Sequence, residues 1–390
     1  MSQPDQSALL AQMEALVPML AEHAAEAEQL RKPVDSVWQA ILDTGAMRYF
    51  VPRSYGGYEF DLQTFMKIGM ALGGGCVSTA WVTTFCMEHN WLMALYSREA
   101  QDDIFGRQPY IVAPGTLAPN GRATPVDGGY RVTGRWEWGT GVMHADWALV
   151  GALMPVEGSD GMDLGMFVVP MSDVTVHDTW QVAGMAATGS NDIEVKDVFV
   201  PAHLVQSATG MRQGNAEGAD LHDSYLYRMP MLPVLGLTAA APALGAAKKA
   251  VELSTERMKE RLMYGTTSKQ GEKPVAQHRL AHAALKVHNL EILIMALAKE
   301  VEDWGKSGQI CPDHDKAFLR LRIGNLVRES RDVVRELMDA SGAHAHFLSS
   351  PLQRFQRDLN TLSCHTVFDT DVSGEAVGRS LLGLEINIPL

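Results

Sequence analysis

Apolar residues recur at helical spacing in the first part of the chain. Positions 9, 10, 13, 16, 17 and 20 are all Leu, Met or Val, which predicts an amphipathic helix over this stretch. A second helix is predicted over 34–44, and a third begins after Asp61, a residue type that caps helix N-termini. The segment from Ser78 to Tyr96 reads as a largely apolar helix, so most of its large side chains are expected in the core.

The pattern changes around Tyr110, where short runs of apolar and β-branched residues replace the helical spacing. Turn signals such as 119–121 (Pro-Asn-Gly) and 127–129 (Asp-Gly-Gly) separate these runs. A compact antiparallel β region is therefore predicted. Its expected strands are Tyr110–Thr116, Tyr130–Trp138, Trp147–Met154, Leu164–Pro170 and Ile193–Val200.

Helical spacing returns after about residue 220 and continues to the C-terminal region. Long amphipathic segments joined by short connections favour an antiparallel bundle. We predict a mostly α-helical α+β protein with an N-terminal helical domain (1–115), a central antiparallel β-barrel or sandwich (116–215) and a C-terminal four-helix bundle (216–390). The four expected helices are Pro233–Tyr264, Val275–Trp304, Asp313–Ala340 and Leu352–Thr370.

Composition narrows the class of partner. Hydrophobic residues make up 46% of the 390 residues, enough for a large core, and the formal net charge is −13. No Lys/Arg run offsets that charge, so a nucleic acid is not an expected partner. The most apolar long stretch, 229–247, is interrupted by three prolines and two glycines, and the N-terminal segment lacks a signal-peptide pattern. Membrane association is not expected. Four dispersed cysteines without a CxxC pair favour a reducing cytoplasm.

Familiar catalytic motifs are missing from the sequence. There is no P-loop and no GxSxG elbow, and the nearest approach to a dinucleotide-binding loop, 139–141, lacks the third glycine. His278 and His282 have the i, i+4 spacing of metal ligands but lie outside an HExxH motif. They are more typical of a helix surface, and no metal is expected.

A set of dispersed motifs carries the first resemblance. The turn 51–57 (Val-Pro-Arg-Ser-Tyr-Gly-Gly), the segment 184–190 (Gly-Met-Ala-Ala-Thr-Gly-Ser) and the pair Arg357–Asp358 occur in this order along nearly the whole chain. Together they resemble the acyl-CoA dehydrogenases. That family abstracts a proton with a glutamate, but the corresponding positions here are His365 and Thr366, and 231–247 contains no Asp or Glu. Without such a base, α,β-dehydrogenation has no route.

The chain instead resembles the two-component flavin monooxygenases built on the same fold, such as the 4-hydroxyphenylacetate hydroxylase oxygenase component. The matching segments are 78–81 (Ser-Thr-Ala-Trp) with His89, 136–142 (Trp-Glu-Trp-Gly-Thr-Gly-Val) and 227–230 (Tyr-Arg-Met-Pro), with His365 near the C-terminus. This resemblance implies a reduced flavin, FMNH2 or FADH2, that reacts with O2 to form a C4a-hydroperoxide. Such a species needs an apolar site that excludes water.

The resemblance also implies roles for individual residues. His89 and His365 are the expected catalytic histidines, with His89 deprotonating or polarising a phenol or indole-type ring. The alternative for His89 is a satisfied core histidine. Trp81 and Phe85 would join His89 in contacting the substrate, although ordinary core packing is the alternative for such residues.

The flavin side of the site is expected to involve other parts of the chain. Thr140 would hydrogen-bond to flavin N5 or to the peroxide, and Arg228 would place positive charge near the ring, or else form a surface salt bridge. Trp138 and Ser190 are expected to pack against and hydrogen-bond to the flavin. Arg261 and Gln277 are expected near the cofactor's phosphates or adenine.

The resemblance implies partners as well. A separate NAD(P)H:flavin reductase would supply reduced flavin, the substrate would be a small aromatic molecule, and the oxygenase would be a homotetramer. Two other functions stay open. One is an oxidising flavoenzyme of the same fold, either an acyl-CoA dehydrogenase-like enzyme with a displaced base or an amine N-oxygenase. The other is a non-catalytic binding protein that kept the fold.

Overall fold

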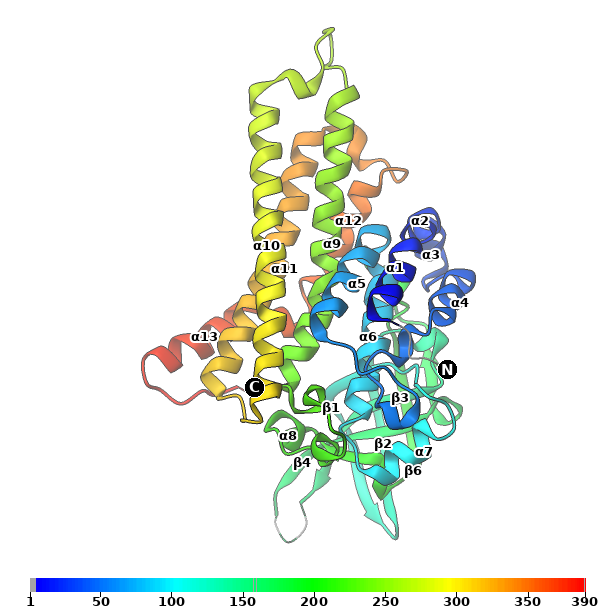
Figure 1. The fold of residues 1–390 in the computed structure, drawn as a ribbon. Coiled ribbons are helices and arrows are strands. Elements are labelled where there is room, and N and C mark those ends of the chain that lie inside the picture. The colour runs from blue at the N-terminus through cyan, green and yellow to red at the C-terminus, as the bar shows by residue number, and fades with distance from the viewer. Residues whose placement is uncertain (1–4, 157, 159, 389) are drawn as a thin grey trace.

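The computed structural model describes residues 5–156, 158, 160–388 and 390. Helices come first, a β-sheet follows and long helices end the chain. In Figure 1 the long helices α9, α10 and α11 stand side by side, with the sheet at their lower end and the N-terminal helices beside α9. The predicted mostly α-helical α+β order is confirmed.

From residue 5 onwards, the N-terminal part has seven α-helices and two short 3-10 helices, η1 (Ala46–Arg48) and η2 (Arg53–Tyr55). The predicted helix over 9–20 is divided at Leu16, because Pro18 in the first turn of α2 has no N–H to continue the helix before it. The prediction that Asp61 caps a helix is confirmed, since its Oδ1 accepts from Thr64 N at 2.7 Å. The helices are α1 (Gln6–Ala15), α2 (Val17–Glu22), α3 (Ala24–Leu30), α4 (Asp35–Asp43), α5 (Leu62–Gly75), α6 (Val77–Met93) and α7 (Arg98–Phe105).

The central β region forms one seven-stranded sheet in the order β5-β6-β2-β1-β3-β4-β7. Its neighbouring strands are antiparallel, as predicted, except that β1 and β3 are parallel. The strands are β1 (Gly115–Val126), β2 (Gly129–Gly139), β3 (Trp147–Pro155), β4 (Met162–Pro170), β5 (Thr175–His177), β6 (Asn191–Pro201) and β7 (Val205–Ser207).

The parallel pair follows from the β1–β2 hairpin. Because β2 runs back along β1, it ends where β1 began, and the connection 140–146 only has to cross the end of the sheet to start β3 on the other edge of β1. This path brings Thr140 close to the beginning of β1. Gly139 lies against Pro114, at 3.7 Å from the position a β-carbon would take to Pro114 Cβ.

Two sequence predictions in this region were wrong. The strand predicted over 110–116 begins only at Gly115, and the turn predicted at 119–121 lies inside β1. The proline and the glycine there are accommodated because the β1–β3 register shifts between Thr116 and Gly121, which leaves the intervening residues outside regular pairing.

The C-terminal bundle is formed by α9 (Met231–Glu260), α10 (Pro274–Ser307), α11 (Asp313–Ser341) and α12 (Pro351–Leu362). The predicted helix over 352–370 was wrong in its second half. It ends at Leu362, a short 3-10 helix, η11 (Thr366–Phe368), follows, and α13 (Thr370–Leu381) starts after the N-cap Asp369. His365 therefore lies in the break between α12 and η11, outside any helix.

The bundle and the N-terminal helices share one core. Gly73 of α5 meets the backbone of Pro242 in α9, and Gly245 of α9 meets the backbone of Met70; a β-carbon at either glycine would lie within 2.3 Å of a backbone oxygen. The two helices therefore pack backbone to backbone, with no room for larger residues. The next helix along the chain, α6, packs against α9 of the bundle and against the short 3-10 helix η5 (Ala186–Thr188) before β6.

Among the described residues, two helices are long and apolar enough to cross a membrane by length and composition. The apolar stretch of α9 is 83% buried inside the protein, as a core helix is, whereas that of α10 is only 28% buried. The outer face of α10 is thus unusually apolar for a surface.

Candidate active site

Three aromatic side chains lie along one face of α6. Trp81, Phe85 and His89 are four residues apart, which places them in a row on a helix. The Trp81 and Phe85 rings stack with centroids 4.5 Å apart, and the Phe85 and His89 rings meet edge to face at 5.6 Å. The row forms an apolar wall that ends in an imidazole.

His365 joins this wall from the break before η11. Its ring centroid lies 5.6 Å from Trp81, 6.2 Å from Phe85 and 6.0 Å from Phe368. Residues that are 280 or more positions apart in the sequence (365 − 85 = 280) therefore meet in one cluster. His365 and Phe368 also line a cleft of about 210 Å³, whose other walls include Arg331 and Asp369 and no residue of α6.

The hydrogen bond of His89 fixes its tautomer. Nδ1 lies 2.7 Å from the carbonyl oxygen of Ala113, which can only accept, so Nδ1 carries the proton. Burial lowers the pKa of His89 to about 4, although the bond to Ala113 opposes this. The ring is neutral at physiological pH, and its Nε2 presents a lone pair.

His365 has the opposite tautomer. The backbone N–H of Val367 donates to His365 Nδ1 at 3.3 Å, so the proton of the neutral ring is on Nε2. Burial lowers the pKa of this ring to about 4 as well. The cluster therefore offers one imidazole nitrogen that accepts and one that donates.

The turn between β2 and η3 (Val142–His144) packs against the neighbouring stripe of α6. Gly141 has φ +78°, and a β-carbon there would lie 3.1 Å from Val82 and 3.3 Å from Cys86. Thr140, the preceding residue, hydrogen-bonds through Oγ1 to Ser190 Oγ at 2.9 Å. The structure thus brings two of the predicted flavin-binding residues together, next to the helix that carries His89.

The surroundings of Thr140 suit a flat heteroaromatic ring. Trp138 has φ +65°, a strained value for a residue with a side chain, and its indole is 60% exposed. Met143, on the other side of Thr140, is 48% exposed. Trp138 and Met143 can cover the ring of a flavin, and the buried hydroxyl of Thr140 can hydrogen-bond to it. These residues therefore fit a bound flavin.

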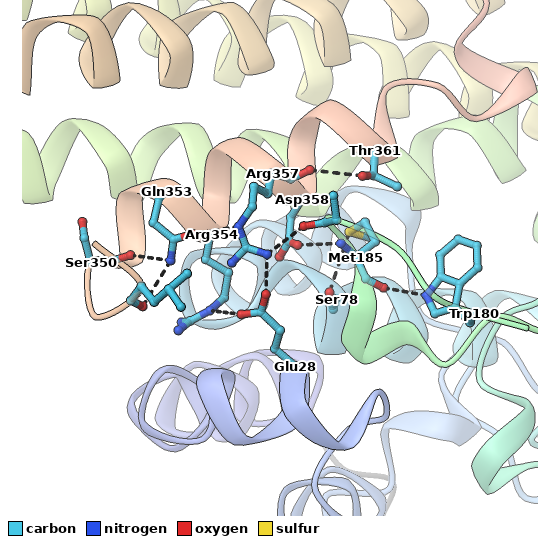
Figure 2. A network of polar contacts seen from close by, with 12 residues as sticks. Glu28, Ser78, Trp180, Met185, Ser350, Gln353, Arg354, Arg357, Asp358 and Thr361 are labelled. Atoms are coloured by element: carbon cyan, nitrogen blue, oxygen red, sulfur yellow. Dashed lines mark hydrogen bonds and ion pairs between the residues drawn. The ribbon is translucent and has the colours of Figure 1, made fainter. Parts of the chain in front are cut away.

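A polar network fixes the loop that carries Ser190 (Figure 2). Asp358 of α12 accepts from Met185 N at 2.6 Å, and Trp180 Nε1 donates to Met185 O at 3.0 Å. Arg357 donates to Ala183 O at 2.7 Å and forms an ion pair with Glu28 of α3. The network joins α3, α12 and the loop before β6, so all three parts of the chain position this side of the site.

Three predicted residues lie away from this cluster in the contacts described. Arg228, in the 3-10 helix η8 (Tyr225–Arg228), pairs with Asp220 at 3.7 Å, which matches the salt-bridge alternative. Arg261 follows the end of α9 and donates to Ser341 O at 2.5 Å, and Gln277 donates to Gly271 O at 2.9 Å. Arg261 lines a separate cleft of about 500 Å³ at the end of the bundle distant from the sheet.

Sequence reasoning missed several residues of the site. Thr188 hydrogen-bonds to Ser190 at 2.7 Å, and its position in the 184–190 motif was the available signal. Gly115 lies directly against His89, and no sequence pattern marks it. Glu88 is buried beside His89 but faces α9, where Thr238 donates to its Oε2 at 3.1 Å. Burial raises the pKa of Glu88 to about 8.

Replacing Gly115 by alanine is expected to impair hydroxylation more than flavin binding. The new β-carbon would lie 2.7 Å from both Cε1 and Nε2 of His89, so the imidazole must move. A displacement of this size costs about tenfold to a hundredfold in rate. Product formation and flavin dissociation constants of the variant check this. Gly378→Ala, where nothing lies within 4 Å, is the control. Unchanged hydroxylation by Gly115→Ala would show that the His89 position is not critical.

The fold and the site together define a flavin-dependent oxygenase of the acyl-CoA dehydrogenase fold. The family described as acyl-CoA dehydrogenase, C-terminal domain, matches residues 237–370. The flavin-dependent monooxygenase, oxygenase subunit HsaA, of Rhodococcus jostii (strain RHA1) is 32% identical over 96% of this chain and 98% of its own. The p-hydroxyphenylacetate 3-hydroxylase, oxygenase component, of Acinetobacter baumannii is 30% identical over 98% of this chain and 91% of its own.

A solved structure extends the similarity to three dimensions. XiaF from Streptomyces sp., in complex with FADH2 and glycerol, has a TM-score of 0.92 and 31% identity, covering 98% of this chain and 97% of that one. This chain belongs to the family of flavin-dependent monooxygenase oxygenase components. The predicted family, fold and flavin cofactor are thereby confirmed.

Proposed function

We propose that this oxygenase hydroxylates a small phenolic or indole-like aromatic substrate bound against the cluster that the α6 wall forms with His365. The observation that carries this proposal is the pairing of an accepting Nε2 on His89 with a donating Nε2–H on His365, at the two ends of one aromatic wall. A ring that bears an O–H or N–H group can stack on the wall and donate to His89. The 3-hydroxylase relative is named for a phenolic substrate, which supports the same class.

Each residue of the chain has a defined task in this proposal. The bound reduced flavin supplies oxygen activated from O2. His89 accepts a hydrogen bond from the substrate's O–H or N–H at Nε2 and takes up that proton as the ring is attacked, which makes the ring more electron-rich and a better nucleophile. His365 donates a hydrogen bond from Nε2. Trp81 and Phe85 hold the ring plane and exclude water, and Thr140 with Trp138 orients the flavin edge.

The roles proposed for Arg228, Arg261 and Gln277 require that several copies of the chain assemble. Arg228 would face the flavin ring, and Arg261 and Gln277 would hold its phosphates or adenine, across a boundary between subunits of a homotetramer. The apolar outer face of α10, with Val275, Leu285 and Ile292 all more than half exposed, supports such packing between copies. A separate NAD(P)H:flavin reductase in the cytoplasm would supply the reduced flavin.

Single-turnover assays with reduced FMN and reduced FAD test the function. The protein is mixed anaerobically with reduced flavin and one member of a panel of phenols, indoles and aromatic acids, and O2 is then added. At least one phenol or indole is expected to give close to one hydroxylated product per flavin. Only H2O2 with every ring, together with flavin reduction by an acyl-CoA thioester, would contradict the proposal.

A further inference from the structure

Three hydroxyl groups form a chain that leads to the flavin side of the site. Thr188 Oγ1 donates to the Met185 carbonyl oxygen at 2.9 Å, Thr188 and Ser190 are 2.7 Å apart, and Ser190 and Thr140 are 2.9 Å apart. The exposed fraction rises along the chain from 1% at Thr188 to 3% at Ser190 and 8% at Thr140. Thr140 is therefore the end that faces a ligand.

The direction of every proton in this chain is determined by its buried end. A carbonyl oxygen can only accept, so the Thr188 proton is used on Met185. Thr188 can then only accept from Ser190, so Ser190 donates its proton to Thr188. Ser190 in turn can only accept from Thr140, so Thr140 donates its proton to Ser190. With its one proton used, Thr140 has only lone pairs left for a ligand.

The Met185 carbonyl that fixes this direction is itself held from several sides. Trp180 Nε1 also donates to this oxygen, and Asp358 accepts from the N–H of the same residue (Figure 2). The backbone N–H of Gly141 donates to Thr188 O at 3.2 Å, which ties the Thr140 turn to the same loop. The geometry of the chain thus depends mainly on backbone contacts, which substitutions of the hydroxyl groups leave in place.

We infer that Thr188 and Ser190 make Thr140 an obligatory hydrogen-bond acceptor, so that the site selects flavin that carries hydrogen on N5. This inference rests on the proposed binding of the flavin edge at Thr140. Reduced flavin has an N5–H that donates to Thr140. Oxidised flavin has only a lone pair at N5, which would meet the lone pairs of Thr140 without a proton between them. Thr188 and Ser190 are positioning residues for the redox state of the bound flavin.

Dissociation constants for oxidised and anaerobically reduced flavin test this selection. Wild type is expected to bind reduced flavin at least about tenfold more tightly, the effect of one buried group left without a partner. In Ser190→Ala the Thr140 proton is free to donate to oxidised N5. In Thr188→Val the Ser190 proton can turn to Thr140 and free its proton. Both variants are expected to lower the ratio of the two constants about tenfold, through tighter binding of oxidised flavin.

Thr188→Ser is the matched control, because it keeps the hydroxyl and is expected to keep the wild-type ratio. If wild type binds both forms of flavin and both Ser190→Ala and Thr188→Val keep the wild-type ratio, the inference is overturned and the proposed function stands. If wild type binds neither form, both are overturned. The measured quantity is a ratio of affinities, so it does not depend on turnover.

Discussion

Replacing His89 by alanine or asparagine is expected to abolish hydroxylation while O2 is still reduced to H2O2. General-base catalysis by a positioned side chain contributes about 10²–10⁴-fold, and the Nε2 lone pair is the only part of His89 that is free for this task. Asparagine is the sharper variant. Its amide N–H can replace the Nδ1–H that donates to Ala113, so the local structure is retained and only the base is removed.

The pH dependence of activity provides an independent check on His89. Because burial lowers the pKa of His89 to about 4, the ring does not titrate between pH 6 and pH 9, and no break in the hydroxylation rate is expected from it there. A histidine with a lowered pKa destabilises the fold as pH falls from about 6.5 towards 4, where the buried ring must become charged.

The effect of His89→Ala and His89→Asn is measured as product yield per reduced flavin, with flavin dissociation constants measured in parallel. His278→Ala, on the exposed surface of α10, is the control and is expected to match wild type. Normal yields from His89→Asn would remove His89 from the proposed mechanism.

Glu88→Gln and Glu302→Gln are expected to change stability in opposite directions at high pH. Both side chains are 1% exposed. Oε1 of Glu88 has no hydrogen-bond partner among the described residues, and burial raises its pKa to about 8. Glu302 of α10 instead accepts from Leu62 N at 2.7 Å, Gln63 Nε2 at 3.1 Å and Lys306 Nζ at 3.0 Å. It caps the start of α5 from another helix.

The sign of the pH effect follows from linkage. An acid whose pKa is raised on folding stabilises the fold fully below its unfolded pKa, and that contribution is lost as pH rises through the folded pKa. Relative to wild type, Glu88→Gln should therefore gain stability from about pH 4.5 to pH 8, by roughly 5 kcal/mol in all. Glu302→Gln loses charge-assisted bonds and should be destabilised by roughly 2–4 kcal/mol.

Urea unfolding at pH 5, 7 and 9 measures both effects. A stability difference between Glu88→Gln and wild type that does not vary with pH would contradict the account of Glu88. Glu88→Gln is also expected to keep hydroxylation, because the Glu88 side chain faces Thr238 and α9, away from the wall that ends in His89. Loss of activity in this variant would instead favour Glu88 as a displaced base.

Sequence periodicity predicted the long elements well because one buried face repeats over many turns. The α10 and α11 helices have such a pattern, whereas the middle of β3 and β4 and much of α9 are buried on every side and stand out as continuous apolar runs. The short strands β5 and β7, three residues each, offer too few positions for a period to show. The break at 363–365 had no proline or glycine to mark it. That break places His365 against Trp81, a contact that local pattern could not predict.

Candidate residues for the site could be chosen where a motif names them, but their geometry could not be predicted. His89, His365 and Thr140 were chosen from resemblance alone. Their protonation depends on partners elsewhere in the chain, namely Ala113 for His89 and Val367 for His365. The direction of the hydroxyl chain depends on the Met185 carbonyl, which becomes visible only when the loop is folded against Asp358.

Hydroxylation by this protein places one oxygen atom of O2 in a C–H bond of an aromatic ring. The most direct test is a single turnover of the protein with reduced flavin, a phenolic substrate and 18O-labelled O2, followed by mass spectrometry of the product. We expect a hydroxylated product that carries one 18O atom. A product whose new oxygen comes from water would contradict this expectation.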